Sequence, residues 1–170
     1  MMKFSANIPR VIHVAALLAL FGHAAFTQAT PQANDEVSGS PRQELSLDGE
    51  WEIVFDPQNV GREQEWHTQD VFSAMLDRRA IEVPCCWEEI EQDYEGVAFY
   101  GRTFAVPQEW EGKTVRLQFD AVNYIAEVWV NGHVIGRHEG GYGPFEFRVD
   151  DLLNFDEENF VSLRVIGPIV

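Results

Sequence analysis

The stretch "EVWVNGHVIG", Glu127–Gly136, decides the fold class of this chain. Asn131 and Gly132 both tolerate a positive φ angle, and such a pair is a strong local signal for a two-residue type I′ turn. The residues on either side are mostly β-branched or aromatic, as is typical of strands. The stretch therefore predicts a β-hairpin.

Alternation of apolar and polar residues extends outward from this hairpin. It is clear in "WEIVF" (51–55), "TVRLQF" (114–119) and "FVSLRVI" (160–166). "AFYGRTFAV" (98–106) and "YIAEVWV" (124–130) are longer runs rich in aromatic and β-branched residues. A period of two residues is typical of strands that bury one face.

Helical patterns are few, at Gln69–Leu76 and at one turn over Asp150–Leu153. Many short strands separated by turns are typical of a β-sandwich or jelly roll. The sequence therefore predicts an all-β domain with helix in less than about a tenth of its residues.

The N-terminal segment has the form of an export signal. Lys3 and Arg10 precede a mainly apolar run, and small residues follow up to Ala29. The uninterrupted apolar part, Val14–Phe21, is shorter than the roughly 20 residues of a membrane-spanning helix. We therefore expect cleavage near Ala29 rather than a retained anchor, and a secreted or periplasmic protein with no membrane attachment afterwards.

The remaining chain divides into two parts. Residues 30–43 are small and polar, which predicts a linker. Residues 44–170 are long enough for one β-sandwich domain with its own core.

Charge excludes two classes of partner. The chain has 28 acidic and 12 basic residues, for a net charge of −16. A nucleic-acid backbone or an anionic bilayer would be repelled, so we expect neither as a partner.

The two cysteines, Cys85 and Cys86, are adjacent. A disulfide between neighbours is strained, and no histidine pair has a spacing that would complete a metal site. We expect two reduced, largely buried thiols, with no metal and no cofactor.

No common catalytic motif is present. The densest acidic segment is "EEIEQDYEG" (88–96), which carries five carboxylates. Glycoside hydrolysis requires a pair of carboxylates, one acting as acid and one as nucleophile or base. Five acids in one short segment are more simply a solvated loop, so we expect no catalytic residue here.

The tryptophans are more informative. Trp51 and Trp129 lie in strand patterns and are predicted to be core residues. Trp66, Trp87 and Trp110 lie near turns, where an aromatic ring either packs against the edge of the sandwich or stacks on a sugar.

"HEGGYGPFEF" (138–147) predicts a loop that crosses one end of the sandwich. Its three glycines permit positive φ angles and close backbone approach, which would place Tyr142 at the loop tip and turn Phe145 and Phe147 inward. The loop serves as a shaped corner, as a docking surface, or as a direct sugar contact.

Together these segments resemble the N-terminal domain of glycoside hydrolase family 2, which includes β-glucuronidases, β-galactosidases and β-mannosidases. The resemblance covers Leu45 to about Val165 and is closest to the β-glucuronidase branch. The segments that carry it are "LSLDGEWEIVFDPQNVG" (45–61), "VPCCWEEI" (83–90), "FYGRTFAVPQEWEGKTVRLQFDAVNYIAEVWVNG" (99–132) and "HEGGYGPFEFRV" (138–149).

The resemblance implies a jelly-roll β-sandwich of the galactose-binding-domain-like type, called the sugar-binding domain of the family. In the family it precedes an immunoglobulin-like domain and a barrel that carries both catalytic glutamates, and neither domain is expected in these residues. In β-galactosidases an asparagine after the Val-Pro pair reaches the active site. Cys86 stands at that position here and lacks an amide, which argues against a β-galactosidase.

Three hypotheses follow. The chain is a non-catalytic module of a secreted glycoside hydrolase, a free-standing lectin-like module, or a small hydrolase that uses the 88–96 segment. Under the first two, the partners are carbohydrate and, in the parent enzyme, the catalytic barrel. The candidates for these contacts are Trp87, Asp93, Tyr94, His138 and Tyr142.

Overall fold

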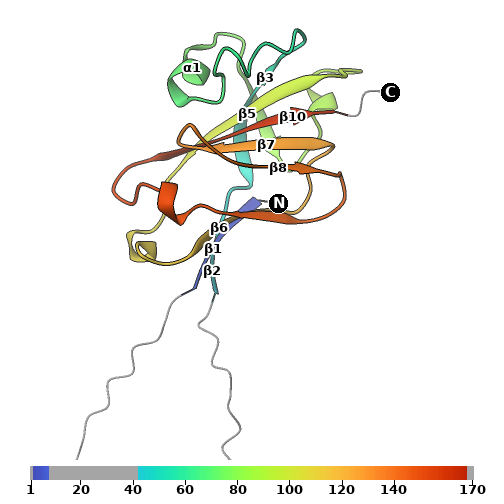
Figure 1. Cartoon of the computed structure of the whole chain (residues 1–170). Coiled ribbons are helices and arrows are strands. Elements are labelled where there is room, and N and C mark those ends of the chain that lie inside the picture. The colour runs from blue at the N-terminus through green and yellow to red at the C-terminus, as the bar shows by residue number, and fades with distance from the viewer. Residues whose placement is uncertain (1, 8–41, 168–170) are drawn as a thin grey trace, which may run out of the picture.

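The computed structural model describes residues 2–7 and 42–167, which form a sandwich of two antiparallel sheets (Figure 1). The all-β prediction is confirmed. The four-stranded sheet has the order β2 (Arg42–Ser46), β1 (Met2–Asn7), β6 (Val115–Phe119), β9 (Phe145–Arg148). The six-stranded sheet has the order β4 (Arg79–Val83), β3 (Gly49–Phe55), β5 (Val97–Phe104), β10 (Asn159–Ile166), β7 (Ile125–Val130), β8 (His133–Glu139).

The apolar residues that alternate along the strands form the interior of the sandwich, as predicted. In β10, Val161, Leu163 and Val165 face the four-stranded sheet and join its Val115 and Leu117 in one apolar cluster. Burying such side chains stabilises each by about 1.5–3 kcal/mol relative to exposure. This cluster therefore holds the two sheets together.

The outer face of the six-stranded sheet is also covered. The segment between β3 and β4 folds back over it and contains α1 (Gln69–Ala74), the only α-helix in the described part of the chain. Phe72 of α1 packs on Phe160 of β10, with ring centroids 5.6 Å apart. This layer explains why seven of the eight residues of β10 are buried.

The guanidinium of Arg78 fixes the C-terminal end of α1. It donates to the carbonyl oxygens of Phe72, Ser73 and Met75, and its Nε lies 2.8 Å from an oxygen of Glu52 on β3. A cation that caps the last carbonyls of a helix also favours the helix dipole. Three 3-10 helices complete the structure, η1 (Trp87–Glu89), η2 (Gln108–Trp110) and η3 (Asp150–Leu152).

The β7–β8 hairpin forms as predicted. Asn131 and Gly132 have φ angles of 50° and 78°, as the two central positions of a type I′ turn require. The Asn131 side chain accepts a hydrogen bond from the Phe160 backbone N–H and donates one to the Leu152 carbonyl. The turn is therefore tied to the start of β10 and to η3.

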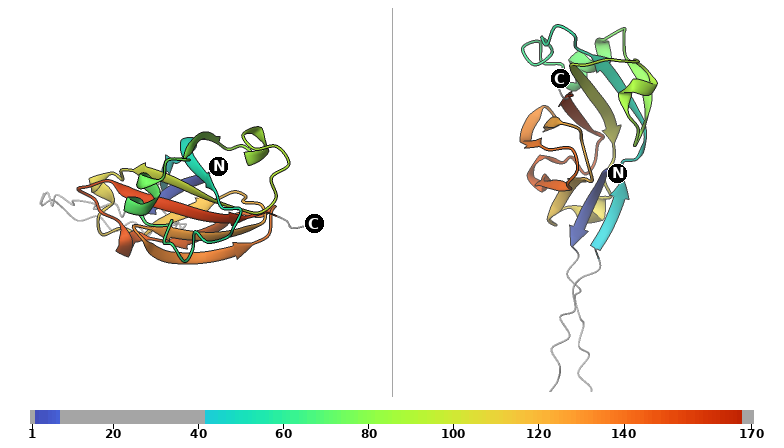
Figure 2. Two further views of the ribbon diagram at one scale, coloured as in Figure 1. Left: turned by 90° about the horizontal axis from the view of Figure 1, so that it is seen from above. Right: turned by 90° about the vertical axis from the view of Figure 1, so that its right-hand side faces the viewer.

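β1 lies within the segment predicted to be an export signal. It pairs with β2 on one side and β6 on the other, and Figure 2 shows β1 and β2 side by side. The Met2 backbone N–H donates to Asp48 over 3.0 Å. Most of the predicted linker, residues 30–43, lies outside the described residues, and its last two residues belong to β2. Within the described ranges, no helix has the length and apolar character needed to span a membrane.

Candidate functional site

Several loops and the end of β10 meet at one end of the sandwich. The Gly140 N–H donates to the Tyr124 carbonyl over 2.9 Å, and the Tyr124 N–H donates to the Ile166 carbonyl over 3.0 Å. The Gly167 N–H donates to the Gly96 carbonyl over 2.9 Å. Backbone hydrogen bonds therefore join segments that are far apart in the sequence.

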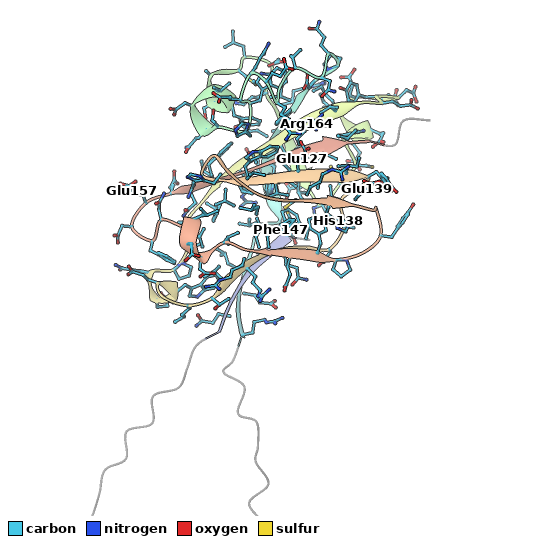
Figure 3. The ribbon with its side chains drawn as sticks, in the orientation of Figure 1. Glu127, His138, Glu139, Phe147, Glu157 and Arg164 are labelled. Carbon is cyan, nitrogen blue, oxygen red and sulfur yellow. The ribbon has the colours of Figure 1, made fainter. Side chains whose placement is uncertain are left out.

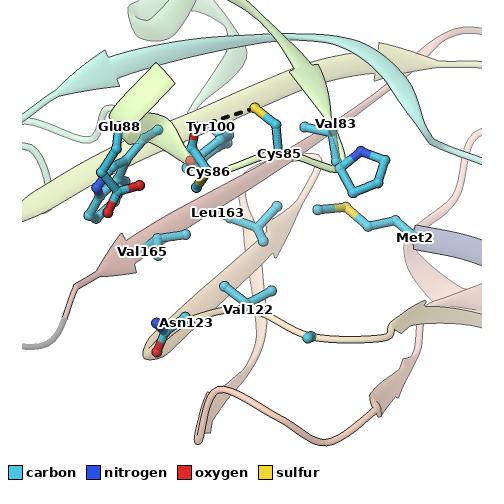
Figure 4. A pocket seen from close by; sticks show the side chains of 13 residues that line it. Met2, Val83, Cys85, Cys86, Glu88, Tyr100, Val122, Asn123, Leu163 and Val165 are labelled. Atoms are coloured by element: carbon cyan, nitrogen blue, oxygen red, sulfur yellow. Dashed lines mark hydrogen bonds between the residues drawn. The ribbon is translucent and has the colours of Figure 1, made fainter. Parts of the chain in front are cut away.

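A cavity of about 240 Å³ opens at this end of the sandwich (Figure 4). Its walls are mostly apolar, and its polar groups come from the turn after β4, from β5 and from the turn after β6. The lining residues are Met2, Val83, Pro84, Cys85, Cys86, Trp87, Glu88, Tyr100, Ala121, Val122, Asn123, Leu163 and Val165.

The two cysteines lie at this cavity, and both are free and exposed. The expectation of reduced thiols agrees with this state, but the expectation that they are largely buried is wrong. Cys85 and Cys86 follow β4, beyond the end of the strand, and their side chains are open to solvent. The Cys85 thiol points to the Cys86 carbonyl oxygen at 3.4 Å.

Two of the lining groups are held in their neutral forms. Burial, followed by the neighbouring Cys85, Glu88 and Cys86, raises the pKa of the Tyr100 phenol. Partial burial, followed by nearby negative groups of which Glu89 is the strongest, raises the pKa of the Cys85 thiol. Tyr100 and Cys85 therefore offer neutral hydrogen-bond donors, and Cys85 is not activated as a thiolate.

Trp87 and Tyr94 are brought together beside the cavity. Trp87 is only 7% exposed, so it forms a wall rather than an open stacking platform. The Tyr94 ring meets Trp87 edge-on at 5.7 Å, and its hydroxyl donates to the Val97 carbonyl over 2.7 Å. Asp93 is exposed on the turn before Tyr94, with a φ angle of 56°.

The other two candidates are His138, near the end of β8, and Tyr142, in the loop between β8 and β9. The His138 ring is half-buried and stacks on Phe145 with ring centroids 4.1 Å apart. Figure 3 labels His138 on β8. Tyr142 is 97% exposed at the loop tip, as predicted. The structure therefore does not bring Tyr142 and His138 into the lining of the cavity.

The loop glycines have different roles. Gly140 has a φ of +133°, which disfavours other residues. A Cβ on Gly141 would lie 2.8 Å from the Asn123 side-chain oxygen, so a glycine is needed there for close approach. Gly143 has neither constraint, so only Gly140 and Gly141 use the conformational freedom that the three glycines permit.

Tryptophan placement agrees with packing rather than with sugar stacking. Trp51 and Trp110 are 1% and 2% exposed, and Trp66 is half-buried with its ring edge-on to Phe99 at 5.6 Å. None of these rings lines the cavity.

The acidic segment behaves as a solvated loop. Four of its five carboxylates are exposed, and Glu91 pairs with Arg79 over 2.7 Å. In the described ranges, no group of three or more histidine, cysteine or acidic side chains is arranged to hold a metal ion.

Alkylation under denaturing, non-reducing conditions is expected to add two groups per chain, because Cys85 and Cys86 are both free and a bond between neighbours would be strained. Intact mass with and without iodoacetamide measures this directly. Uptake of no alkyl group would mean that the two thiols are bonded to each other.

Comparisons with known proteins identify the domain. A family model described as "Glycosyl hydrolases family 2, sugar binding domain" matches residues 89–167. The chain carries a family 2 sugar-binding domain. A β-glucuronidase from Bacteroides fragilis is 32% identical over 129 residues, which cover 72% of this chain and 16% of the relative. A β-glucuronidase from Paenibacillus borealis is 34% identical over 73% of this chain and 21% of the relative.

Solved structures agree. The β-glucuronidase of Ruminococcus gnavus in complex with D-glucuronic acid superposes with a TM-score of 0.66 and 27% identity, over 72% of this chain and 21% of that one. The sugar-binding domain of this chain is thus similar to the jelly-roll N-terminal domain of β-glucuronidases. The chain spans about a fifth of the length of these relatives.

Sequence reasoning missed most of the residues that line the cavity. Tyr100, Val122 and Asn123 carry no motif of their own, and Leu163 and Val165 were expected only as core residues. The one sequence signal was the Val-Pro pair followed by two cysteines, which the family resemblance had already singled out.

Proposed function

We propose that this chain is the non-catalytic N-terminal domain of an exported glycoside hydrolase of the β-glucuronidase type. In such an enzyme it would cover the catalytic barrel and contribute one wall of the substrate cleft. The observation that carries the proposal is the family 2 domain match, together with relatives of which the matched segment covers only about a fifth.

The state of the buried carboxylates supports a non-catalytic role. Among the described residues only Asp56 and Glu127 are buried acids. Asp56 accepts hydrogen bonds from the backbone N–H groups of Val60 and Gly61, at 2.9 and 2.8 Å. Glu127 is ion-paired to two arginines. Neither is available as the acid or the nucleophile that glycoside hydrolysis requires.

The chain alone is therefore expected to release no chromophore from aryl β-glucuronides or aryl β-galactosides. The exposed carboxylates of the 88–96 segment lack the rigid spacing and the burial that separate two pKa values. The double variant Glu88→Gln, Glu89→Gln is the control. Turnover by the parent chain that this variant loses would instead support a small hydrolase.

A domain exchange tests whether this chain can serve as the N-terminal domain of a β-glucuronidase. Residues 42–167 replace the matching segment of the Paenibacillus borealis β-glucuronidase, and the same enzyme with that segment deleted serves as the reference. The proposal expects the exchanged enzyme to hydrolyse aryl glucuronides and the deleted one to lose activity. Glycoside binding by the free chain, combined with an inactive exchanged enzyme, would favour a lectin-like module.

Export is also part of the proposal, and it requires the domain to fold without β1. Cleavage near Ala29 would remove β1, which pairs with both β2 and β6. The mass of the exported protein distinguishes the two states. An N-terminus at Thr30 supports export processing, whereas an intact N-terminus in the folded protein would contradict it and agree with the role of β1.

A further inference from the structure

We propose that the cavity at the loop end of the sandwich binds an uncharged aryl or alkyl group of a glycoside and rejects a uronate carboxylate. This inference deepens the proposed function and rests on it, because it takes the cavity to be the carbohydrate-facing site of the domain. It states that this domain contacts the apolar group of the glycoside and not its carboxylate.

The size and walls of the cavity suit an apolar ring. Its volume of about 240 Å³ exceeds the roughly 150 Å³ of an apolar protein cavity that holds benzene. Val83, Val122, Leu163 and Val165 supply aliphatic walls, and Trp87 supplies an aromatic one. An apolar group that leaves water for these walls is favoured by the hydrophobic effect.

Apart from Glu88, the polar side chains at the cavity are two thiols, a phenol and an amide. The Cys85 and Cys86 thiols, the Tyr100 phenol and the Asn123 amide all line it. Thiols and phenols donate weakly or moderately, and an amide both donates and accepts. This set suits hydroxyl groups or a glycosidic oxygen next to an apolar ring.

Charge at the cavity disfavours a uronate. Glu88 is the one charged side chain among the described lining residues, and Glu82 and Glu89 are close enough to raise the pKa of Cys85. Carboxylates in proteins are recognised by arginine forks or by lysine, and the described lining contains no arginine, lysine or histidine. A bound uronate would instead face Glu88. The uronate of a glucuronide substrate must therefore be held outside this cavity.

Two probes that differ only in the carboxylate test this on the full chain. They are phenyl β-D-glucopyranoside and phenyl β-D-glucuronide. The readout is the rate at which iodoacetamide alkylates Cys85 and Cys86, followed by mass spectrometry. We expect the glucoside to slow alkylation at a concentration at least about tenfold lower than the glucuronide, a difference of about 1.4 kcal/mol in binding.

Three variants link the effect to the cavity. Glu88→Gln removes the facing charge and should narrow the tenfold ratio to less than about threefold. Glu146→Gln makes the same change on β9, where Glu146 pairs with Arg116, and should leave the ratio unchanged. Ala121→Phe fills the mouth from an exposed position, so it should abolish protection without disturbing the core.

Three results would overturn the inference: equal or better protection by the glucuronide, protection that survives Ala121→Phe, or no protection by either probe. None of these results bears on the domain exchange, which depends on enzyme activity. If the exchanged enzyme is active but neither probe protects the cysteines, the proposed function is supported and only this inference is wrong.

Discussion

Replacing Trp129 by alanine is expected to lower the free energy of unfolding by about 3–5 kcal/mol, the usual range for a buried aromatic side chain. Trp129 is 5% exposed and lies on the outer face of β7. Its ring stacks on His67 at a centroid distance of 4.9 Å and on Phe99 at 6.4 Å. Truncation would open a cavity between the sheet and the segment that covers it.

Urea denaturation followed by circular dichroism measures this change. Tyr142→Ala is the matched control, because this aromatic ring is 97% exposed and its loss should cost less than about 0.5 kcal/mol. A loss of less than about 1 kcal/mol for Trp129→Ala would mean that the covering segment does not bury the ring in solution.

The strands of this domain were predictable because each carries its own pattern. The alternation in 115–119 and 160–166 reports which residues share a face, and a sandwich buries one such face per strand. The Asn131-Gly132 turn was predictable for a different reason, since few residue pairs accept two consecutive positive φ angles. Both signals are local, so they can be recognised without knowing which strands will pair.

The outer layer was not predictable in the same way. Trp129 was correctly expected to be buried, but its side chain lies outside the sandwich, under the segment that contains α1. Arg164 and Ser162 of β10 are polar and buried on that same face. The alternation correctly separates these two faces, but it cannot say that a loop will return to cover the second one.

The cavity depends on long-range placement and was beyond sequence reasoning. Its lining joins the turn after β4, Tyr100 of β5, the turn after β6 and two residues of β10. The order of strands in the sheet decides which turns meet at one end, and periodicity carries no information on that order. The same limit explains the error over Cys85 and Cys86, whose exposure follows from their place beyond the sheet end.

Replacing Glu127 by glutamine is expected to lower the free energy of unfolding by about 3–5 kcal/mol, because it leaves a buried charge without its counter-ion. The Glu127 carboxylate lies 2.8 Å from Arg164 and 3.0 Å from Arg62. Glu127 and Arg164 are 8% and 6% exposed and lie on the neighbouring strands β7 and β10 (Figure 3). Arg62 is mostly exposed, so the pair with Arg164 carries most of the effect.

The remaining contacts of Arg164 cannot compensate. Its Nη2 donates to the Asn59 side-chain oxygen over 2.6 Å, and its Nε is buried with no partner among the described residues. A neutral amide at position 127 can still accept a hydrogen bond from Arg164, but it leaves the buried guanidinium without a counter-charge.

Two further variants separate the buried charge from a general loss of an ion pair. Glu146→Gln breaks the exposed pair with Arg116 and should cost at most about 1 kcal/mol. The double variant Glu127→Gln, Arg164→Met removes both charges, and it should be more stable than Glu127→Gln alone because a buried pair replaced by apolar groups is often tolerated. Urea denaturation of all three provides the comparison. If Glu127→Gln costs no more than Glu146→Gln, water reaches Arg164 and the segment that follows β3 does not seal this face of the sheet.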